Sequence, residues 1–166
     1  MYTTIATLKY RDYVPHGWIA AEFCNLEVMG VRDSIVKSVD NEWNDVKFEK
    51  YDKIKEEIAA LEAQKVLLNA EADDLDAKYK SSKKWYRFAN ATEKAWKNSA
   101  AMKRSEIDQI DSKIQALDDD KFFTASELKR RAHDLLVRHG FVLINTSSSG
   151  NECVTHTEVW HKTTED

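Results

Sequence analysis

The stretch YDKIKEEIAALEAQKVLLNAEADDLDAKY, residues 51–79, decides the fold of this chain. Apolar or small side chains recur in it at alternating spacings of three and four, which is the heptad pattern of a coiled coil. One position of the heptad holds Tyr51, Ile58, Lys65, Ala72 and Tyr79, and the other holds Ile54, Leu61, Leu68 and Leu75. The residues between them are mostly charged or polar, as the solvent-facing side of a helix requires. The pattern predicts a long amphipathic helix.

The chain around this stretch has few residues that break a helix. Glycine and proline occur only at Pro15, Gly17, Gly30, Gly140 and Gly150. Residues 31–139 therefore contain neither of the two residue types that mark most turns. A β or α/β domain of that length needs more turns, so the composition favours helix through the middle of the chain.

A second apolar seam follows between Trp85 and Leu117. Its members are Phe88, Thr92, Trp96, Ala100, Ile107, Ile110, Ile114 and Leu117. A reversal near Ser81, Ser82 and Lys83 would bring both seams together as an antiparallel coiled-coil hairpin. The competing interpretation is one helix of about 70 residues, roughly 110 Å long, which would bury its seam against another chain.

The hairpin interpretation also predicts a register. With the reversal at residues 81–83, the numbers of facing residues sum to 164 or 165. This register puts Leu68 opposite Trp96 and leaves Lys65, beside Ala100, as the one charged layer of the seam.

The segments on either side of the hairpin are shorter. Residues 3–13 have strand composition, and residues 18–29 read as a short helix between Gly17 and Gly30. Three aspartates at 118–120 should end the second long helix, because carboxylates at a helix C-terminus oppose its dipole. The sequence Thr-Ala-Ser-Glu at 124–127 is a capping box that begins a third helix, and Gly140 is placed to end it.

The last part of the sequence predicts a β-hairpin. Residues 141–144 read as a strand, residues 147–151 as a turn and residues 153–161 as the returning strand. Because an isolated two-stranded hairpin is marginal in water, we expect the N-terminal strand to join it in one small sheet.

Together these elements predict a mainly α chain with a small β element, an α+β fold. Residues 46–118 would form the helical coiled-coil hairpin. Residues 1–45 and 119–166 would form a small α+β head built from the N-terminal strand, short helices and the C-terminal β-hairpin.

Composition narrows the functional classes. The 166 residues carry a formal net charge of -4, which provides no general attraction for nucleic acid or anionic membranes. The start of the sequence lacks a signal-peptide pattern, and no apolar run approaches the roughly 20 residues that span a bilayer. Because no such segment is present, we expect a cytoplasmic protein without membrane partners. Cys24 and Cys153 are far apart in the sequence, so we expect both thiols to be reduced.

A basic and aromatic cluster lies at the proposed hairpin tip. Its candidate partner-binding residues are Lys83, Lys84, Trp85, Tyr86 and Arg87. Aromatic side chains interleaved with cations can dock on a protein partner or stack on bases, and the acidity of the whole chain favours a protein. The alternative is that Trp85 and Phe88 close the end of the coil over Tyr79 and Leu75.

A second basic cluster lies on the third predicted helix. Its candidate nucleic-acid-binding residues are Lys129, Arg130, Arg131 and Arg138. The order of helix and hairpin over residues 124–162 resembles the recognition helix and wing of winged-helix DNA-binding proteins, although it contains no diagnostic motif of that family. The alternative is a solvated helix face, because acidic residues four positions away can pair with most of these cations.

The sequence predicts no catalytic residue, no metal site and no cofactor. The only candidate metal ligands, Cys153, His156 and His161, would lie on opposite faces of one strand. No phosphate-binding loop, dinucleotide fingerprint or nucleophile motif occurs, and the acidic clusters read as solvated faces.

These observations favour a non-enzymatic protein-interaction module that uses its coiled-coil surface. The module could be a homodimer, an adaptor, or an inhibitor of a larger complex. The alternative function is a winged-helix-like nucleic-acid-binding protein that dimerises through the coil. No small-molecule substrate is evident from the sequence.

Overall fold

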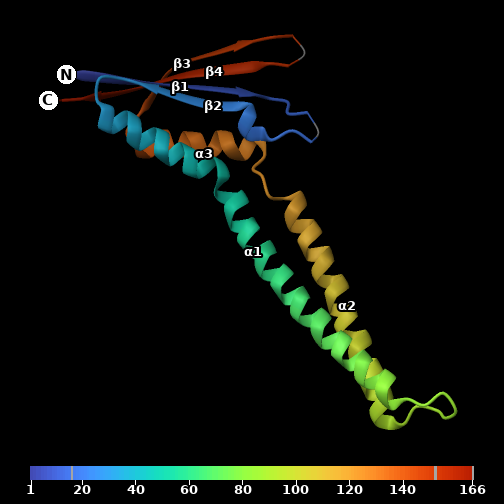
Figure 1. Cartoon of the computed structure of the whole chain (residues 1–166). Coiled ribbons are helices and arrows are strands. Elements are labelled where there is room, and N and C mark those ends of the chain that lie inside the picture. Colours follow the sequence, from blue (N-terminus) through green and yellow to red (C-terminus); the bar gives the residue numbers. More distant parts are fainter. Residues whose placement is uncertain (16, 152, 166) are drawn as a thin grey trace. The chain divides into compact units, whose positions relative to one another are not determined.

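The structure is a computed structural model that describes residues 1–15, 17–151 and 153–165. Its elements in chain order are the strand β1 (Tyr2–Arg11), a 3-10 turn (Ala20–Glu22), β2 (Cys24–Met29), α1 (Asp33–Ser82), α2 (Ala91–Asp119), α3 (Ala125–Arg138), β3 (Val142–Ser149) and β4 (Thr155–Thr164) (Figure 1). The chain divides into two compact units. The first is Met1–Asp52 with Phe122–Asp166, and the second is Lys53–Lys121. The predicted α+β fold, with a helical hairpin and a small sheet, is confirmed.

The four strands of the first unit form one antiparallel sheet in the order β2, β1, β4, β3. β1 pairs with β4 from Tyr2 opposite Thr164 to Arg11 opposite Thr155. The expectation that the N-terminal strand joins the C-terminal hairpin is therefore confirmed.

The helix predicted over residues 18–29 is wrong. Only Ala20–Glu22 forms a helical turn, and Cys24–Met29 is the strand β2. Cys24, Leu26 and Val28 are buried, while the residues between them are exposed. This alternation has the period of two that belongs to a half-buried strand, and β1 supplies the neighbour that satisfies its backbone.

The predicted turn over residues 147–151 begins too early. Ser147–Ser149 continue β3 and face Thr155–Thr157 of β4. The turn itself needs Gly150, whose φ is +109°. A Cβ atom there would lie 2.4 Å from the carbonyl oxygen of Cys153, so the backbone approach excludes any other residue.

The core of the first unit lies between the sheet and α3, together with the first turns of α1. The predicted apolar stripe of α3 is confirmed, and all of its members are fully buried: Leu128, Ala132, Leu135 and Leu136. The Thr124 side chain caps the helix by accepting from the Glu127 N–H. At the other end Gly140, with a φ of +85°, and Phe141 donate to the carbonyls of Val137 and Leu136, which is a Schellman motif.

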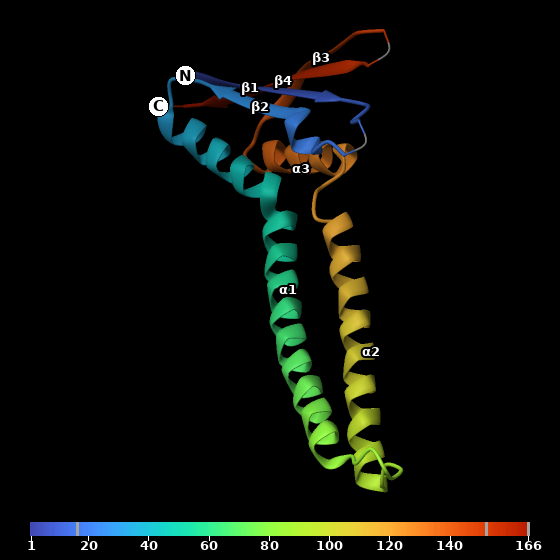
Figure 2. The same cartoon turned by 45° about the vertical axis from the view of Figure 1, so that its right-hand side comes forward.

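In the second unit, α2 and the part of α1 after residue 52 lie side by side as an antiparallel hairpin (Figure 2). The seam positions of α1 are the buried or half-buried ones, with Ile54 and Ala72 most fully enclosed. On α2, Ala100, Ile107 and Ile110 are buried in the same way. α2 ends at Asp119, as the three aspartates predict.

The predicted register of the hairpin is wrong. Lys103 pairs with Glu71 at 2.6 Å and Lys65 with Asp111 at 2.5 Å. These residue numbers sum to 174 and 176, whereas the prediction was 164 or 165. α1 does end at Ser82, but residues 83–90 form a loop and not the first turns of the second helix. Each residue of α1 therefore faces a residue of α2 that lies more than one helical turn further along the chain than predicted. Lys65 consequently faces a carboxylate and not Ala100.

Candidate protein-docking site at the hairpin tip

The loop of residues 83–90 presents three aromatic side chains to solvent. Trp85 is 93% exposed, Tyr86 69% and Phe88 95%. The rings of Trp85 and Tyr86 meet edge to face with centroids 5.7 Å apart. The alternative interpretation, in which Trp85 and Phe88 close the end of the coil, is therefore wrong.

Arg87, in this loop, forms hydrogen bonds with residues of both helices. Its guanidinium donates to the two carboxylate oxygens of Glu93 at 2.7 and 3.1 Å, in a bidentate pair. It also donates to the carbonyl oxygen of Ser82 at 2.8 Å and to that of Phe88 at 3.1 Å. One side chain thus joins the last residue of α1, the loop and the first turn of α2.

Glu93 completes a capping box at the start of α2. Its carboxylate accepts from the Asn90 N–H at 2.9 Å, and the Asn90 side chain accepts from the Glu93 N–H at 2.8 Å. Glu93 is fully buried. Its pKa is lowered to about 2, first by the Arg87 hydrogen bonds and then by the backbone of Asn90. The expected seam residue Thr92 is exposed instead.

The sequence contains a local signal for this loop that is separate from the apolar seam. Asn90 followed three residues later by Glu93 has the spacing of a capping box, which marks a helix start. This spacing marks Ala91 as the start of α2, and it makes residues 83–90 the connection between the two helices.

The tip is strongly basic although the chain is acidic. Residues 78–97 hold seven basic side chains and one acidic side chain, so their net charge is +6, against -4 for the whole chain. The basic residues are Lys78, Lys80, Lys83, Lys84, Arg87, Lys94 and Lys97. Lys83 bonds the carbonyl oxygens of Lys84 and Arg87, while Lys84 is exposed. The five residues predicted to bind a partner, Lys83 to Arg87, all lie within the loop of residues 83–90.

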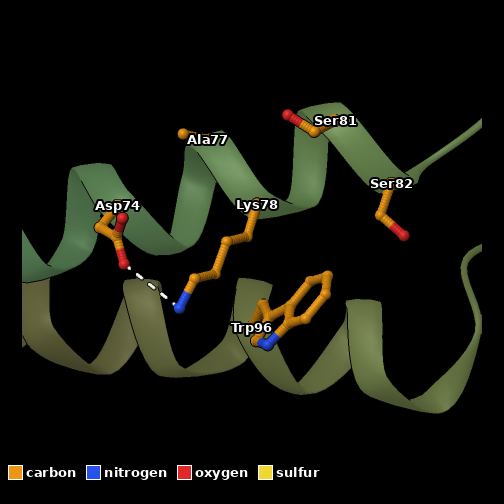
Figure 3. Close-up of a pocket in the computed structure, with 6 residues that line it drawn as sticks. All are labelled: Asp74, Ala77, Lys78, Ser81, Ser82 and Trp96. Atoms are coloured by element: carbon orange, nitrogen blue, oxygen red, sulfur yellow. Dashed lines mark ion pairs between the residues drawn. The ribbon is translucent and has the colours of Figure 1, made fainter.

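An open hollow of about 420 Å³ lies between α1 and α2 beside the loop. Its lining residues are Asp74, Ala77, Lys78, Ser81, Ser82 and Trp96. In Figure 3 the indole of Trp96 lies across from Lys78 and Ser82, and Lys78 forms an ion pair with Asp74 at 3.3 Å. Trp96 was expected to face Leu68, so the change of register is what makes it part of this hollow.

The candidate nucleic-acid-binding residues on α3 have other contacts. Arg131 pairs with Glu49 at 3.6 Å, and Arg138 pairs with Glu42. Lys129 lies over the ring of Tyr10, with its Nζ 4.8 Å from the centroid. Arg130 is exposed and has no ion-pair partner in the part of the chain that the structure describes.

No three potential metal ligands converge among residues 1–15, 17–151 and 153–165. His156 is held instead by Asp12 at 2.7 Å and Ser148 at 2.8 Å. Of the helices described, none combines the length and the apolar character needed to cross a bilayer.

The chain matches no protein-family model, no curated protein and no solved structure.

Proposed function

We propose that this chain is a non-enzymatic protein-interaction module, and that the tip of its helical hairpin docks on an acidic, partly apolar surface of a partner protein. The observation that carries the proposal is the exposure of Trp85, Tyr86 and Phe88 on a loop that Arg87 and Glu93 hold in place.

Large aromatic side chains are the residues that most often dominate binding energy in protein interfaces. Exposing three of them to water in one loop is unfavourable for the free chain. Covering them with a partner removes this apolar surface from water and is therefore favourable. The bidentate contact of Arg87 with Glu93 keeps the loop ordered before binding, so less conformational entropy is lost on docking.

The basic charge of the tip indicates which kind of partner surface it would bind. The net charge of +6 over residues 78–97 favours a partner surface rich in Asp and Glu, and it would accelerate the encounter at low ionic strength. The hollow beside Trp96 could receive an apolar side chain from the partner. This exposed tip would suit an adaptor, and it would equally suit an inhibitor that occupies a site on a larger complex.

Site-specific photocrosslinking in the native host tests the proposal. A photoreactive phenylalanine analogue at Tyr86 should form an adduct with one discrete acidic protein. The same analogue at Met102, which is 67% exposed on α2, is the matched control and should not form that adduct. Combining the Tyr86 probe with Trp85→Ala and Phe88→Ala should abolish the adduct, and raised salt should weaken it.

Equal adducts from both positions, or an adduct that survives the two alanine substitutions, would contradict docking through the tip. Crosslinking of Tyr86 to an oligonucleotide or to lipid would show that the tip binds nucleic acid or a membrane and not a protein. Circular dichroism of each variant separates loss of binding from loss of fold.

The winged-helix-like alternative stays a prediction with less support, because Arg131 and Arg138 already have carboxylate partners. A gel shift at low salt with duplex DNA, compared with the variant Arg130→Ala, tests it. Binding that this substitution leaves unchanged would remove α3 as the DNA-contacting helix.

A further inference from the structure

The stem of α1, residues 53–82, carries a second apolar stripe on the side that faces away from α2. Its positions repeat with alternating spacings of four and three, and all of its members are exposed: Ala59, Ala63, Val66, Ala70, Asp73 and Ala77. α2 lies along the other side of α1, where Ile54 and Ala72 are buried (Figure 2). A helix with heptad seams on two sides can pack against two neighbouring helices.

Val66 and Leu67 distinguish this outer stripe from an ordinary solvated face. Val66 is 69% exposed, and Leu67, which borders the stripe, is 64% exposed. The solvent-facing side of a helix is normally charged or polar. The alanines before and after these two residues have short side chains, so another helix can approach the stripe closely. Covering the stripe would remove two adjacent aliphatic side chains from water.

The charged residues at the two ends of the outer stripe determine which helix fits it. Lys53 and Lys55 lie beside its N-terminal end, and Asp74 and Asp76 lie beside its C-terminal end. A second α1 in parallel orientation would place lysines beside lysines and aspartates beside aspartates. A second α1 in antiparallel orientation would place lysines beside aspartates, and charges at such flanking positions set the orientation of paired helices. The stripe is therefore complementary to a reversed copy of itself.

The charge of the hairpin tip favours the same orientation. Residues 78–97 carry a net charge of +6. The other residues of the second unit, 53–77 and 98–121, hold seven basic and thirteen acidic side chains, a net charge of -6. Parallel pairing of two stems would bring two basic tips together. Antiparallel pairing keeps the tips at opposite ends and avoids this repulsion.

We infer that the stems of two copies of this chain pair antiparallel along the outer stripe, about a twofold axis at the level of Ala63 and Val66. In this register the numbers of facing residues sum to 129. Ala63 of each copy lies opposite Val66 of the other, where the short side chain leaves room for the longer one. Ala59 lies opposite Ala70 in the next layer. Because the axis is twofold, each of these contacts occurs twice.

The charged residues beside the stripe fit this register. Lys53 of each copy lies beside Asp74 of the other, and Lys55 lies beside Asp76. Exposed ion pairs contribute little free energy, so these pairs select the orientation while the aliphatic contact provides the attraction.

Leu67 lies beside Ala60 of the other copy, which widens the apolar contact around the axis. One layer of the register is unfavourable, because Glu56 faces Asp73. This layer lies at the end of the contact, and Arg104 of the same chain pairs with Asp73 at 3.2 Å and reduces the repulsion. The apolar layers lie between the two copies of this layer.

Light scattering over a range of concentrations tests the inference. The mass of the wild type should rise with concentration from 19.2 kDa toward twice that value, since a dilute single chain has only water against the stripe. Val66→Lys with Leu67→Lys should remain at 19.2 kDa, and circular dichroism should show an intact helix because lysine is a good helix former. The matched control is Val142→Lys with Ile144→Lys, two aliphatic residues of β3 that are 63% and 57% exposed. This control should dimerise as the wild type does.

Disulfide trapping tests the antiparallel register independently. In a Cys153→Ser background, an Ala59→Cys chain mixed with an Ala70→Cys chain should form a disulfide between the two variants on mild oxidation, because facing residues lie within disulfide reach. Each variant alone is the control. Its two cysteines would be separated by eleven residue positions, or about 17 Å at 1.5 Å per residue, and should not crosslink.

A wild type of single-chain mass at every concentration would overturn the inference. So would a dimer that survives Val66→Lys with Leu67→Lys, or cysteine variants that crosslink alone but not in the mixture. The inference does not rest on the proposed function, because that function uses the hairpin tip. Trp85→Ala with Phe88→Ala should leave the mass unchanged, and a dimer that dissociates with these substitutions would place self-association at the tip.

Discussion

Glu93 is fully buried at the start of α2 and binds the guanidinium of Arg87 at 2.7 and 3.1 Å, six residues earlier in the chain. The contact spans a loop whose aromatic side chains are exposed, so polar contacts hold the loop: this ion pair, the helix cap, and the hydrogen bonds from Arg87 and Lys83 to backbone carbonyls. This arrangement makes the tip sensitive to the ionisation of one carboxyl group.

The first prediction concerns acid. The pKa of Glu93 is lowered to about 2 from an ordinary value of 4.5. A carboxyl group with a depressed folded-state pKa contributes stability above its unfolded pKa, and that contribution is lost as the pH falls from about 4.5 to about 2. The difference in urea stability between the wild type and Glu93→Gln should therefore shrink over this window. A difference that stays constant from pH 6 to pH 3 would contradict the assignment.

The second prediction concerns the cap of α2. Asn90→Ala removes the side-chain acceptor of the Glu93 N–H and should cost about 1 kcal/mol of unfolding free energy. Asn90→Asp keeps an acceptor and should retain most of that stability. Chemical denaturation followed by circular dichroism measures both variants. Equal loss in the two would show that the cap is not the cause.

The third prediction concerns the seam. Ala72 is fully buried, so Ala72→Leu should overpack the hairpin and cost about 1 to 3 kcal/mol. Ala63 is exposed on the same helix, and Ala63→Leu should change the unfolding free energy by less than about 0.5 kcal/mol. Thermal and urea unfolding compare the pair, and similar values for both would contradict the observed seam.

The fourth prediction concerns the two thiols. Cys24 is buried, and burial first, followed by the charge of Glu158, raises its pKa to about 12. Because the thiolate is the reactive form, Cys24 should resist iodoacetamide up to about pH 9 in the folded chain. Cys153 is exposed and should react readily. Mass spectrometry after labelling, repeated in denaturant, identifies the modified residue.

The fifth prediction concerns Thr4. Its side chain is 1% exposed, and its hydroxyl has no hydrogen-bond partner among the residues that the structure describes. An unpaired buried hydroxyl is costly, so Thr4→Val, which keeps the shape, should raise the unfolding free energy by about 1 kcal/mol. Destabilisation by this substitution would indicate that the hydroxyl is satisfied in solution.

The predictions from sequence succeeded where structure depends on neighbours along the chain. The burial of Ile54 and Ala72 follows from the three and four spacing of a helix, and this periodicity needs no knowledge of the partner surface. The start of α3 at Ala125 and its end before Gly140 follow from a cap and a glycine, which are also local features.

The predictions failed where distant segments decide the outcome. Residues 24–29 are a strand because β1 lies alongside to accept and donate their backbone hydrogen bonds. The exposure of Trp85 and Phe88 could not be predicted from composition, because the same residues would have suited a closed end of the coil.

The heptad stretch at 51–79 determined by itself that the chain contains a long helix and which of its faces is buried, because both depend on a local periodicity. Only the tertiary structure decided where that face meets α2, because the register depends on the length of the loop 83–90 and on ion pairs such as Lys65 with Asp111. The same loop places the aromatic side chains on which the proposed function rests.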